Sequence, residues 1–287
     1  MEMITTFIQN VAMRLSLLIF CFAVVCCSDS TSSNSQPAVA PPHAVQEDQW
    51  KEVWSDEFNY HGLPDSTKWS YDVGGHGWGN NELQFYTQKR VENARVENGN
   101  LVIEAKKETW QGKNYTSARI VTKNKGDWQH GKIEVRAKLP RGRGTWPAIW
   151  MLASTTPLKW PDDGEIDIME HVGFDQGVIH GSIHSKKYNW VVGNGKTATI
   201  TVPDCSEQFH LYGLEWDKDS LKISMDNKVY LAVANEHTGY DAWPYNNKMH
   251  LLLNIAVGGN WGGQKGVDDT IWPQKMEVDY VRVWQKK

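Results

Sequence analysis

Gly164-Glu165-Ile166-Asp167-Ile168-Met169-Glu170 places three carboxylic acids among uncharged hydrophobic residues. The alternation is typical of a β-strand, in which successive side chains point to opposite faces. Glu165 and Asp167 would then share one face, with Ile166 and Ile168 on the other. Strict alternation would turn Glu170 into the core, where an unpaired carboxylate costs several kcal/mol.

A β-bulge offers the chain a cheaper arrangement, because it inserts one extra residue and resets the face that the strand presents. It sacrifices one ladder hydrogen bond, at a net cost of about 0.5–1.5 kcal/mol. We therefore expect a bulge near Ile168 and Met169. Glu165, Asp167 and Glu170 would then project together into one groove, with the Cα atoms of the two glutamates roughly 13 Å apart.

Two carboxyl groups on either side of a groove suit the hydrolysis of a glycosidic bond. One attacks the anomeric carbon and the other protonates the departing oxygen, and a retaining enzyme holds them about 5 Å apart. The side chains of Glu165 and Glu170 are long enough to close the gap between their backbones. We expect Asp167 to hydrogen-bond a glutamate and to help separate the two pKa values. There are two alternatives, a Ca²⁺ site and a solvated strand face. Calcium loops, however, favour Asp, Asn and Gly in turns.

The composition favours a protein that faces carbohydrate. The chain has 287 residues and 15 tryptophans, and tryptophan stacks on flat apolar faces such as those of pyranose rings. A core position remains the ordinary expectation for any single tryptophan. The net charge is −4 without a basic block, which excludes nucleic acid as an expected partner. Only Cys205 lies in the body of the chain, so no internal disulfide framework is available there.

The N-terminal segment predicts export. The apolar run Leu15–Val25 is too short to span a bilayer and fits the central region of a signal peptide. We expect a signal peptide over residues 1–27, with Met13 as an alternative start. The run ends at Cys26 and Cys27, which resembles a bacterial lipoprotein signal. We expect an exported protein, either anchored at the cell surface or outer membrane through a lipid-modified Cys26 or Cys27, or secreted.

The rest of the chain divides into a tether and one folded domain. Residues 28–48 are rich in Ser, Pro, Ala and Gln and predict a disordered linker. Residues 49–287 are long enough for one β-sandwich core. Short alternating segments are separated by turn residues, and we find no long segment with a 3.6-residue period. These features predict an all-β domain of two stacked antiparallel sheets.

Two further patterns identify candidate groove residues. His180 and His184 have the spacing of a helical zinc site, but they lie in an alternating segment that predicts a strand. We expect His184 to line the groove, with a structural histidine as the alternative. The glycine-rich stretch 74–80 lacks a surrounding βαβ unit, so we interpret it as a flexible loop at the groove edge that ends in Asn80, Asn81 and Glu82.

Several motifs, in matching order along nearly the whole domain, resemble glycoside hydrolase family 16. The segment from Glu165 to Glu170 is similar to that family's E-x-D-x-x-E signature in its bulged form, and Trp146-Pro147-Ala148-Ile149-Trp150-Met151 resembles the strand opposite. Other similar segments are 54–58, 81–86, 254–263 and 279–283. Within the family, the sequence around the acids and the segment Gly258–Gly263 resemble bacterial laminarinases.

The resemblance implies a β-jelly roll sandwich of two antiparallel sheets with a concave substrate cleft. It implies that Glu165 is the nucleophile, that Glu170 is the acid/base, and that Asp167 assists by orienting and tuning the nucleophile. It implies substrate contacts at Trp146, Trp150, Arg119, Asn80, His184 and Trp261. No cofactor is expected for catalysis. A structural Ca²⁺ away from the cleft would be held by Glu57, the Gly99 carbonyl and Asp279.

The leading functional hypothesis is endo-acting, retaining hydrolysis of laminarin-type β-1,3-glucan by a two-glutamate double displacement. A mixed-linkage β-1,3-1,4-glucanase, an agarase, a carrageenase and a transglycosylase are alternatives with related chemistry. A non-catalytic β-glucan-binding protein is the alternative of another class, although such proteins often lack one or both glutamates that this chain keeps. We expect a polysaccharide as the partner and a monomer as the working form.

Overall fold

The structure is a computed structural model in which residues 50–287 are described. The predicted signal peptide, the linker and the lipid attachment at Cys26 or Cys27 lie outside the described residues. Residues 50–287 form 18 strands and no α-helix, which confirms the all-β prediction. Within this part of the chain, no helix has the length and apolar character needed to cross a membrane.

One sheet has ten strands. From one edge to the other they are β16 (Lys228–Ala234), β15 (Ser220–Met225), β14 (His210–Trp216), β9 (Gly131–Lys138), β18 (Gln274–Lys286), β5 (Asn100–Trp110), β6 (Lys113–Ser117) and β3 (Gln84–Tyr86). Two further strands branch from this path, β1 (Trp50–Asp56) beside β18 and β4 (Ala94–Glu97) beside β5. The strand pairs are antiparallel except for β3 and β6, which run parallel.

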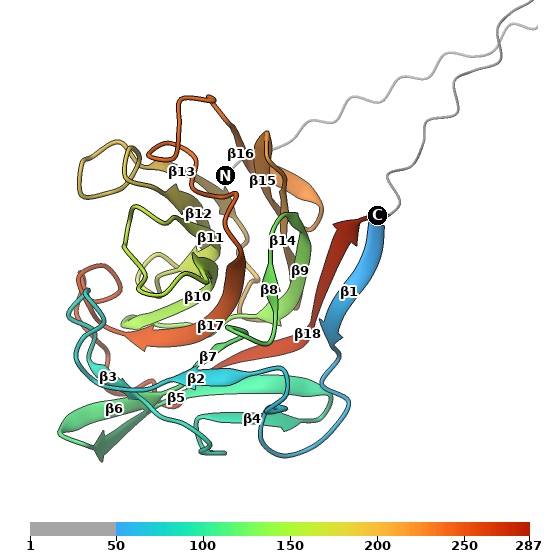
Figure 1. The fold of residues 1–287 in the computed structure, drawn as a ribbon. Helices are drawn as coiled ribbons and strands as arrows, with labels where there is room; N and C mark the ends of the chain where they lie inside the picture. The colour runs from blue at the N-terminus through green and yellow to red at the C-terminus, as the bar shows by residue number, and fades with distance from the viewer. Residues whose placement is uncertain (1–49) are drawn as a thin grey trace, which may run out of the picture. The chain divides into compact units, whose positions relative to one another are not determined.

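The other sheet has eight strands. In order they are β13 (Lys196–Thr201), β12 (Val178–His184), β11 (Glu165–His171), β10 (Thr145–Ala153), β17 (Met249–Val257), β7 (Arg119–Val121) and β2 (Ser70–Asp72), with β8 (Asp127–Trp128) beside β17. Figure 1 shows the two layers, with β10, β11 and β17 in one and β5, β9 and β18 in the other.

The core lies between the two sheets and follows the period of two in their strands. In β9, buried and half-buried residues alternate along the whole strand, so one face packs inward. Side chains of both sheets join in one buried cluster, for example Ile133 of β9 with Ile166 and Ile168 of β11. The isoleucines of the acidic segment therefore anchor β11 to the core, which leaves its other face for the carboxyl groups.

Candidate active site

Strand β11 carries a bulge at Ile168. The adjacent residues Ile149 and Trp150 of β10 pair with Met169 and Asp167, so the pairing skips Ile168. The register toward β12 shifts at the same place. The prediction of a bulge near Ile168 and Met169 is confirmed. The cause is the one expected from the sequence, because the skipped residue lets isoleucines and acids occupy opposite faces.

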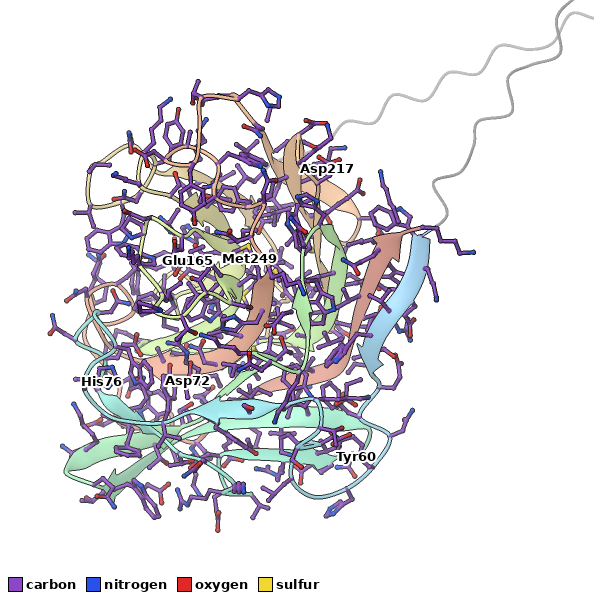
Figure 2. The ribbon with its side chains drawn as sticks, in the orientation of Figure 1. Tyr60, Asp72, His76, Glu165, Asp217 and Met249 are labelled. Carbon is purple, nitrogen blue, oxygen red and sulfur yellow. The ribbon has the colours of Figure 1, made fainter. Side chains whose placement is uncertain are left out.

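The bulge brings the three acids into one cleft of about 850 Å³. Glu165, Asp167 and Glu170 all line this cleft, whereas Ile166 and Ile168 are fully buried in the core. The cleft runs across the eight-stranded sheet, from side chains of β13 to the loop before β3. Figure 2 labels Glu165 and, in that loop, His76.

Each glutamate is held by one tryptophan. Trp146 Nε1 donates to Glu170 Oε1 at 3.0 Å, and Trp160 Nε1 donates to Glu165 Oε2 at 3.1 Å. Trp146 lies in β10 opposite the acidic strand, as the sequence predicted. Trp160 lies in the loop before β11 and was not among the predicted site residues. An indole N–H on one carboxylate oxygen orients the group and leaves the other oxygen for a reacting atom.

Asp167 is buried and contacts His184 rather than a glutamate. His184 Nε2 lies 3.1 Å from Asp167 Oδ2 and 3.7 Å from Glu165 Oε1. Among the described residues, no hydrogen bond joins Asp167 to Glu165 or Glu170. Strand pairing explains the contact, because β12 sets His184 directly opposite Glu165. Potential ligand atoms of Glu165, Asp167 and His184 all lie within 4.8 Å of one another, so this trio also has metal-ligand spacing.

The electrostatics of the cluster favour retained protons. Burial raises the pKa of Glu165, Asp167 and Glu170, each to about 8. The charge of Asp167 raises the pKa values of both glutamates further. His184 acts in the opposite direction on both glutamates, and Arg119 does so on Glu165. The acids titrate as one coupled group, in which one carboxyl group stays protonated while a neighbour ionises.

Arg119 and Trp150 form one end of the cleft. The Arg119 guanidinium lies between two rings, 4.6 Å from the centroid of Trp150 and 4.8 Å from that of Trp78. Arg119 Nε also pairs with Asp72 Oδ2 at 2.9 Å. Trp150 Nε1 donates to Asn254 Oδ1 at 2.7 Å. These contacts hold both predicted residues in the wall and give this end of the cleft a rigid, cationic surface.

Asn80 and Trp261 lie on two loops that meet beside the acids. The Asn80 carbonyl accepts a hydrogen bond from the Asn260 N–H at 2.7 Å. The ring of Trp261 packs edge-to-face on Trp146, with centroids 5.6 Å apart. A side chain at Gly262 would come within 2.8 Å of Trp146 Cβ, so only glycine permits this close approach. The glycine-rich segment therefore presses Trp261 against the tryptophan that holds Glu170.

All six predicted substrate contacts line the cleft, together with residues that sequence reasoning missed. His184 was expected there, and His180 on the same strand face also lines it. Two signals in the sequence could have identified some of the missed residues. Trp160 lies only five residues before Glu165, and the 74–80 loop carries the aromatic rings of His76 and Trp78. The missed lining residues include His76, Trp78, Trp160, His180, Trp190, Lys196, Asn260 and Gln264, whereas Glu82 was expected at the groove edge.

The three residues predicted to hold calcium lie at one corner of the ten-stranded sheet. Glu57 directly follows β1, whose last residue pairs with Val281 of β18. Asp279 lies two residues earlier in β18, where the register shifts. Gly99 lies in the turn between β4 and β5, and β5 pairs with β18 just before that shift. The strand pairing thus brings the backbones of these three residues close together.

Both carboxylates have arginine partners in the structure. Arg282 Nε and Nη2 each donate to Glu57 at 2.8 Å, and Arg136 Nη1 donates to Asp279 at 2.6 Å. These pairs are partly exposed, so their exchange for another cation costs little. The oxygen donors suit calcium, and Glu57, Asp279 and the Gly99 carbonyl would hold the ion once the arginines turn outward. Bound calcium would supply stability at this corner, and its presence stays a prediction.

The comparisons with known proteins agree with this geometry. The sequence profile "Glycosyl hydrolases family 16" matches residues 81–282. A beta-glucanase of Rhodothermus marinus is 52% identical over 244 residues, which cover 82% of this chain and 85% of that protein. The X-ray structure of the laminarinase from Rhodothermus marinus has a TM-score of 0.82 at 51% identity, and the match covers 83% of this chain and 98% of that chain.

A further solved structure is that of SCLam, a non-specific endo-beta-1,3(4)-glucanase. Its TM-score is 0.80 at 50% identity, with 86% of this chain and 94% of that chain covered. These matches confirm the jelly-roll prediction. Since the family profile spans more than half of the sequence and the relatives share its fold, this chain belongs to glycosyl hydrolase family 16.

Proposed function

We propose that this protein is an endo-acting, retaining hydrolase of laminarin-type β-1,3-glucan. The observation that carries the proposal is the bulge in β11, which turns Glu165, Asp167 and Glu170 into one cleft. The names of its relatives, a beta-glucanase and a laminarinase, support the substrate class. The course of the cleft across the sheet from β13 to β7 supports attack within a chain, because a polymer could lie along it on both sides of the acids.

In the first step, a carboxylate oxygen of Glu165 forms a bond to the anomeric carbon as the bond to the glycosidic oxygen breaks. Glu170 gives its proton to that departing oxygen. Glu165 suits the nucleophile's role because the charge of Arg119 favours its ionised form, an influence that Glu170 does not share. Burial and the charge of Asp167 hold a proton on the cluster near neutral pH, and Glu170, which lacks the influence of Arg119, suits the role of the acid that carries it.

In the second step, water attacks the anomeric carbon, and Glu170 takes the proton of the water while the bond to Glu165 breaks. Two inversions at the same carbon retain its configuration. The ester at Glu165 removes one negative charge from the cluster. The pKa of Glu170 therefore falls once the intermediate forms, which favours its change from acid to base.

The two tryptophans and Asp167 act as positioning groups in this scheme. The N–H groups of Trp146 and Trp160 hold the carboxyl groups of Glu170 and Glu165 in place. Asp167 holds His184 beside the nucleophile and supplies the negative charge that keeps the acid protonated. Positioning of this kind lowers the barrier because the reacting groups need not reorganise during the step.

The proposal is tested by incubation of the protein with laminarin, followed by detection of new reducing ends and analysis of product length and anomer. We expect oligosaccharides of intermediate length from the start, with the β-anomer formed first. Tight laminarin binding without reducing ends would instead support the glucan-binding alternative. Products longer than the substrate would support a transglycosylase.

A broader specificity is the second candidate, and one relative favours it. SCLam, which is 50% identical over most of this chain, is a non-specific endo-beta-1,3(4)-glucanase. A parallel digest of lichenan, agarose and carrageenan tests this candidate. Comparable rates on laminarin and lichenan would assign mixed-linkage activity, and activity confined to agarose or carrageenan would overturn the glucan proposal.

We further propose that the protein is exported, and that it is either secreted or anchored through a lipid on Cys26 or Cys27. We propose a monomer as its working form. The apolar run Leu15–Val25 followed by these cysteines supports the export signal. Fractionation of cells that express the full chain, compared with a variant carrying Cys26→Ser and Cys27→Ser, tests the anchor. Membrane association that the double substitution does not change would contradict lipid attachment.

A further inference from the structure

The loop between β12 and β13 presents an apolar tip at the outer end of the cleft. Three successive residues are exposed, Trp190 at 59%, Val191 at 61% and Val192 at 60%. Single exposed apolar residues are ordinary, but a contiguous exposed patch beside a cleft marks an interaction site. Trp190 itself lines the cleft, so the patch continues the site described above.

The tip is held outward by a buried side chain. Asn189 Oδ1 accepts hydrogen bonds from the N–H groups of Val191 at 3.0 Å and Val192 at 3.2 Å. Asn189 Nδ2 donates to the Ser185 carbonyl at 2.9 Å. Because the buried amide satisfies these backbone groups, the turn keeps one shape with Trp190 exposed. The exposure is therefore a property of a well-determined turn rather than of a loose loop.

An aromatic path joins this tip to the reacting groups. The ring of Trp160 lies 6.3 Å from that of Trp190 at an angle of 40°, and it is itself 40% exposed. Trp160 in turn donates to Glu165 at 3.1 Å. We call Trp160 and Trp190 the outer platform. It extends the cleft from the nucleophile side toward β13, where Lys196 and Thr197 complete the lining.

The opposite end of the cleft shows what a tryptophan with a structural role looks like. Trp78 contacts His76, Tyr86 and Arg119, with ring or guanidinium distances of 4.3, 5.4 and 4.8 Å. In the described structure, the ring contact of Trp190 is with Trp160 alone. The ring of Trp78 is therefore occupied by contacts with other side chains of the protein. The ring of Trp190 is largely exposed, so its surface is available for a ligand.

We infer that the outer platform forms an additional subsite, at which Trp190 stacks on a pyranose ring distant from the cleaved bond. The inference rests on the proposed function and extends it to the length of chain that the protein grips. The occupant is the polysaccharide already in the cleft, because the aromatic path is continuous with it. Lys196 Nζ pairs with Glu236 at 3.0 Å, and Glu236 also pairs with Lys187 at 2.8 Å. The apolar rings of the outer platform, rather than this shared ion pair, favour the flat C–H face of an uncharged sugar.

The test is Trp190→Ala measured on β-1,3-gluco-oligosaccharides of increasing length, from the shortest one cleaved up to laminarin. For substrates long enough to reach the platform, we expect kcat/KM to fall by about tenfold, which corresponds to about 1.4 kcal/mol. For the shortest substrates we expect no change. Trp190→Phe keeps an aromatic face and should retain most of the activity on long chains.

Two matched variants control for indirect effects. Trp110 is another exposed tryptophan, at the end of β5 and stacked on Arg90, outside the cleft lining. Trp110→Ala should leave the length profile unchanged. Asn189→Ala should reproduce the length-dependent loss of Trp190→Ala, because it releases the turn that presents the ring. Thermal unfolding of each variant shows that the domain is intact.

The outcomes separate this inference from the proposed function. If the wild-type protein does not cleave β-1,3-glucan, the proposed function is wrong, and the length series is run on the polysaccharide of the panel that it does cleave. Should it cleave none, oligosaccharide binding is measured by calorimetry with and without Trp190→Ala. An equal loss at every length, or no loss at any length, would overturn the outer subsite.

Discussion

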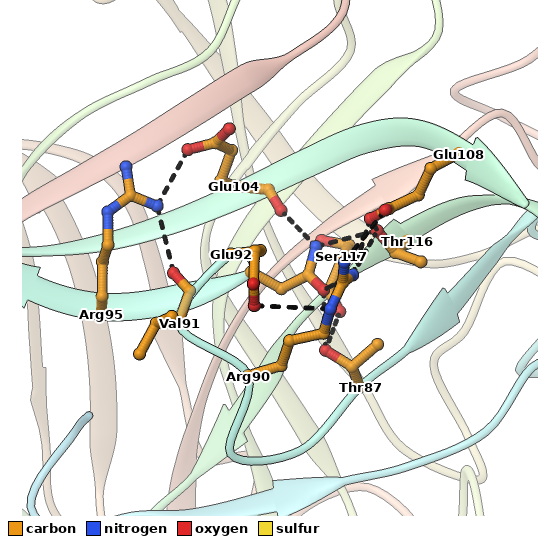
Figure 3. Close-up of polar contacts among 10 residues, drawn as sticks. Thr87, Arg90, Val91, Glu92, Arg95, Glu104, Glu108, Thr116 and Ser117 are labelled. Carbon is orange, nitrogen blue, oxygen red and sulfur yellow. Dashed lines mark hydrogen bonds and ion pairs between the residues drawn. The ribbon is translucent and has the colours of Figure 1, made fainter. Parts of the chain in front are cut away.

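Glu108 on β5 and the three acids on β11 differ in what faces them. On β5, Glu108 accepts hydrogen bonds from Arg90 at 2.6 and 2.9 Å and from the Thr116 hydroxyl (Figure 3). These bonds, with Arg90 as the largest cause, lower the pKa of Glu108 to about 2. The carboxylate is permanently ionised near neutral pH and ties the loop before β4 to the sheet.

On β11, the acids face one another instead of an arginine. Burial without a paired guanidinium raises the pKa of Glu165 and Glu170 to about 8. The difference shows that the same side chain is structural where the fold supplies a cation and reactive where it supplies burial and like charge. The surroundings of each carboxyl group therefore decide its role. Substitutions of the β11 acids should reduce activity, whereas substitutions at the Arg90–Glu108 pair should reduce stability.

The largest expected effect is on activity from Glu165→Gln. Loss of the nucleophile should reduce kcat on laminarin by roughly 10⁴-fold or more, while the unfolding temperature stays close to that of the wild type. Glu108→Gln is the matched control from the other group, and it should leave kcat unchanged. Substantial turnover by Glu165→Gln would contradict the assignment of the nucleophile.

Glu170→Gln should show that the second glutamate works differently. Loss of the general acid should reduce the rate on laminarin by about 10²–10⁴-fold. An aryl β-glucoside with an acidic phenol needs no proton on its leaving group, so its glycosylation step should be much less impaired. Burst kinetics on the aryl substrate separate the two steps. Equal impairment of glycosylation on both substrates would indicate that Glu170 is not the acid.

Asp167→Asn should move the alkaline limb of the pH–rate profile. The negative charge of Asp167 raises the pKa of Glu170, so an uncharged amide lets Glu170 lose its proton at lower pH. The fall in kcat/KM that we expect for the wild type near pH 8 should therefore shift to lower pH in the variant. An unchanged or opposite shift would show that Asp167 does not tune the acid.

The same acids set a pH dependence of stability. Their folded-state pKa values lie above the unfolded ones, so the stability that they contribute is complete below about pH 4. It is lost as the pH rises toward about 8. In Asp167→Asn, the free energy of unfolding should therefore fall less between pH 5 and pH 8 than it does in the wild type. Denaturant unfolding midpoints of both proteins across this range test the prediction.

Arg90→Met should weaken the fold and spare the chemistry. We expect a loss of about 1 kcal/mol in the free energy of unfolding near neutral pH, since the pair is partly exposed. The pKa of Glu108 is lowered, so the stability from this pair is present above pH 4.5 and disappears as the pH falls toward 2. Denaturant unfolding at pH 7 and pH 3 tests this. A difference that is larger at pH 3 would contradict it.

The smallest expected effect concerns calcium at Glu57, Gly99 and Asp279. Removal of calcium with a chelator should lower the unfolding temperature by roughly 2–4 °C, and added calcium should restore it by mass action. Glu57→Gln should abolish the response. The kcat value should stay constant throughout, because this corner contributes nothing to the cleft lining. An unfolding temperature that does not change when calcium is removed or added would rule out the site.

Much of the site could be predicted because its signals are local. The alternation around Ile166 and Ile168 depends only on the period of a strand, and it made the bulge necessary once Glu170 had to avoid the core. The placement of the two glutamates in one groove followed from this alternation, whereas the six groove contacts, Trp146 among them, were implied by the resemblance to the family's motifs. The same reasoning predicted two sheets without a helix among the residues that the structure describes.

Other features depend on which segments meet in space, and no local pattern contains that information. Asp167 contacts His184 because the pairing of β11 with β12 sets that histidine opposite Glu165. Trp160 reaches Glu165 across a loop whose course only the folded chain defines. Side-chain direction is a property of one strand, whereas the choice of partner depends on the register and packing of several segments, and so it emerges only in the tertiary structure.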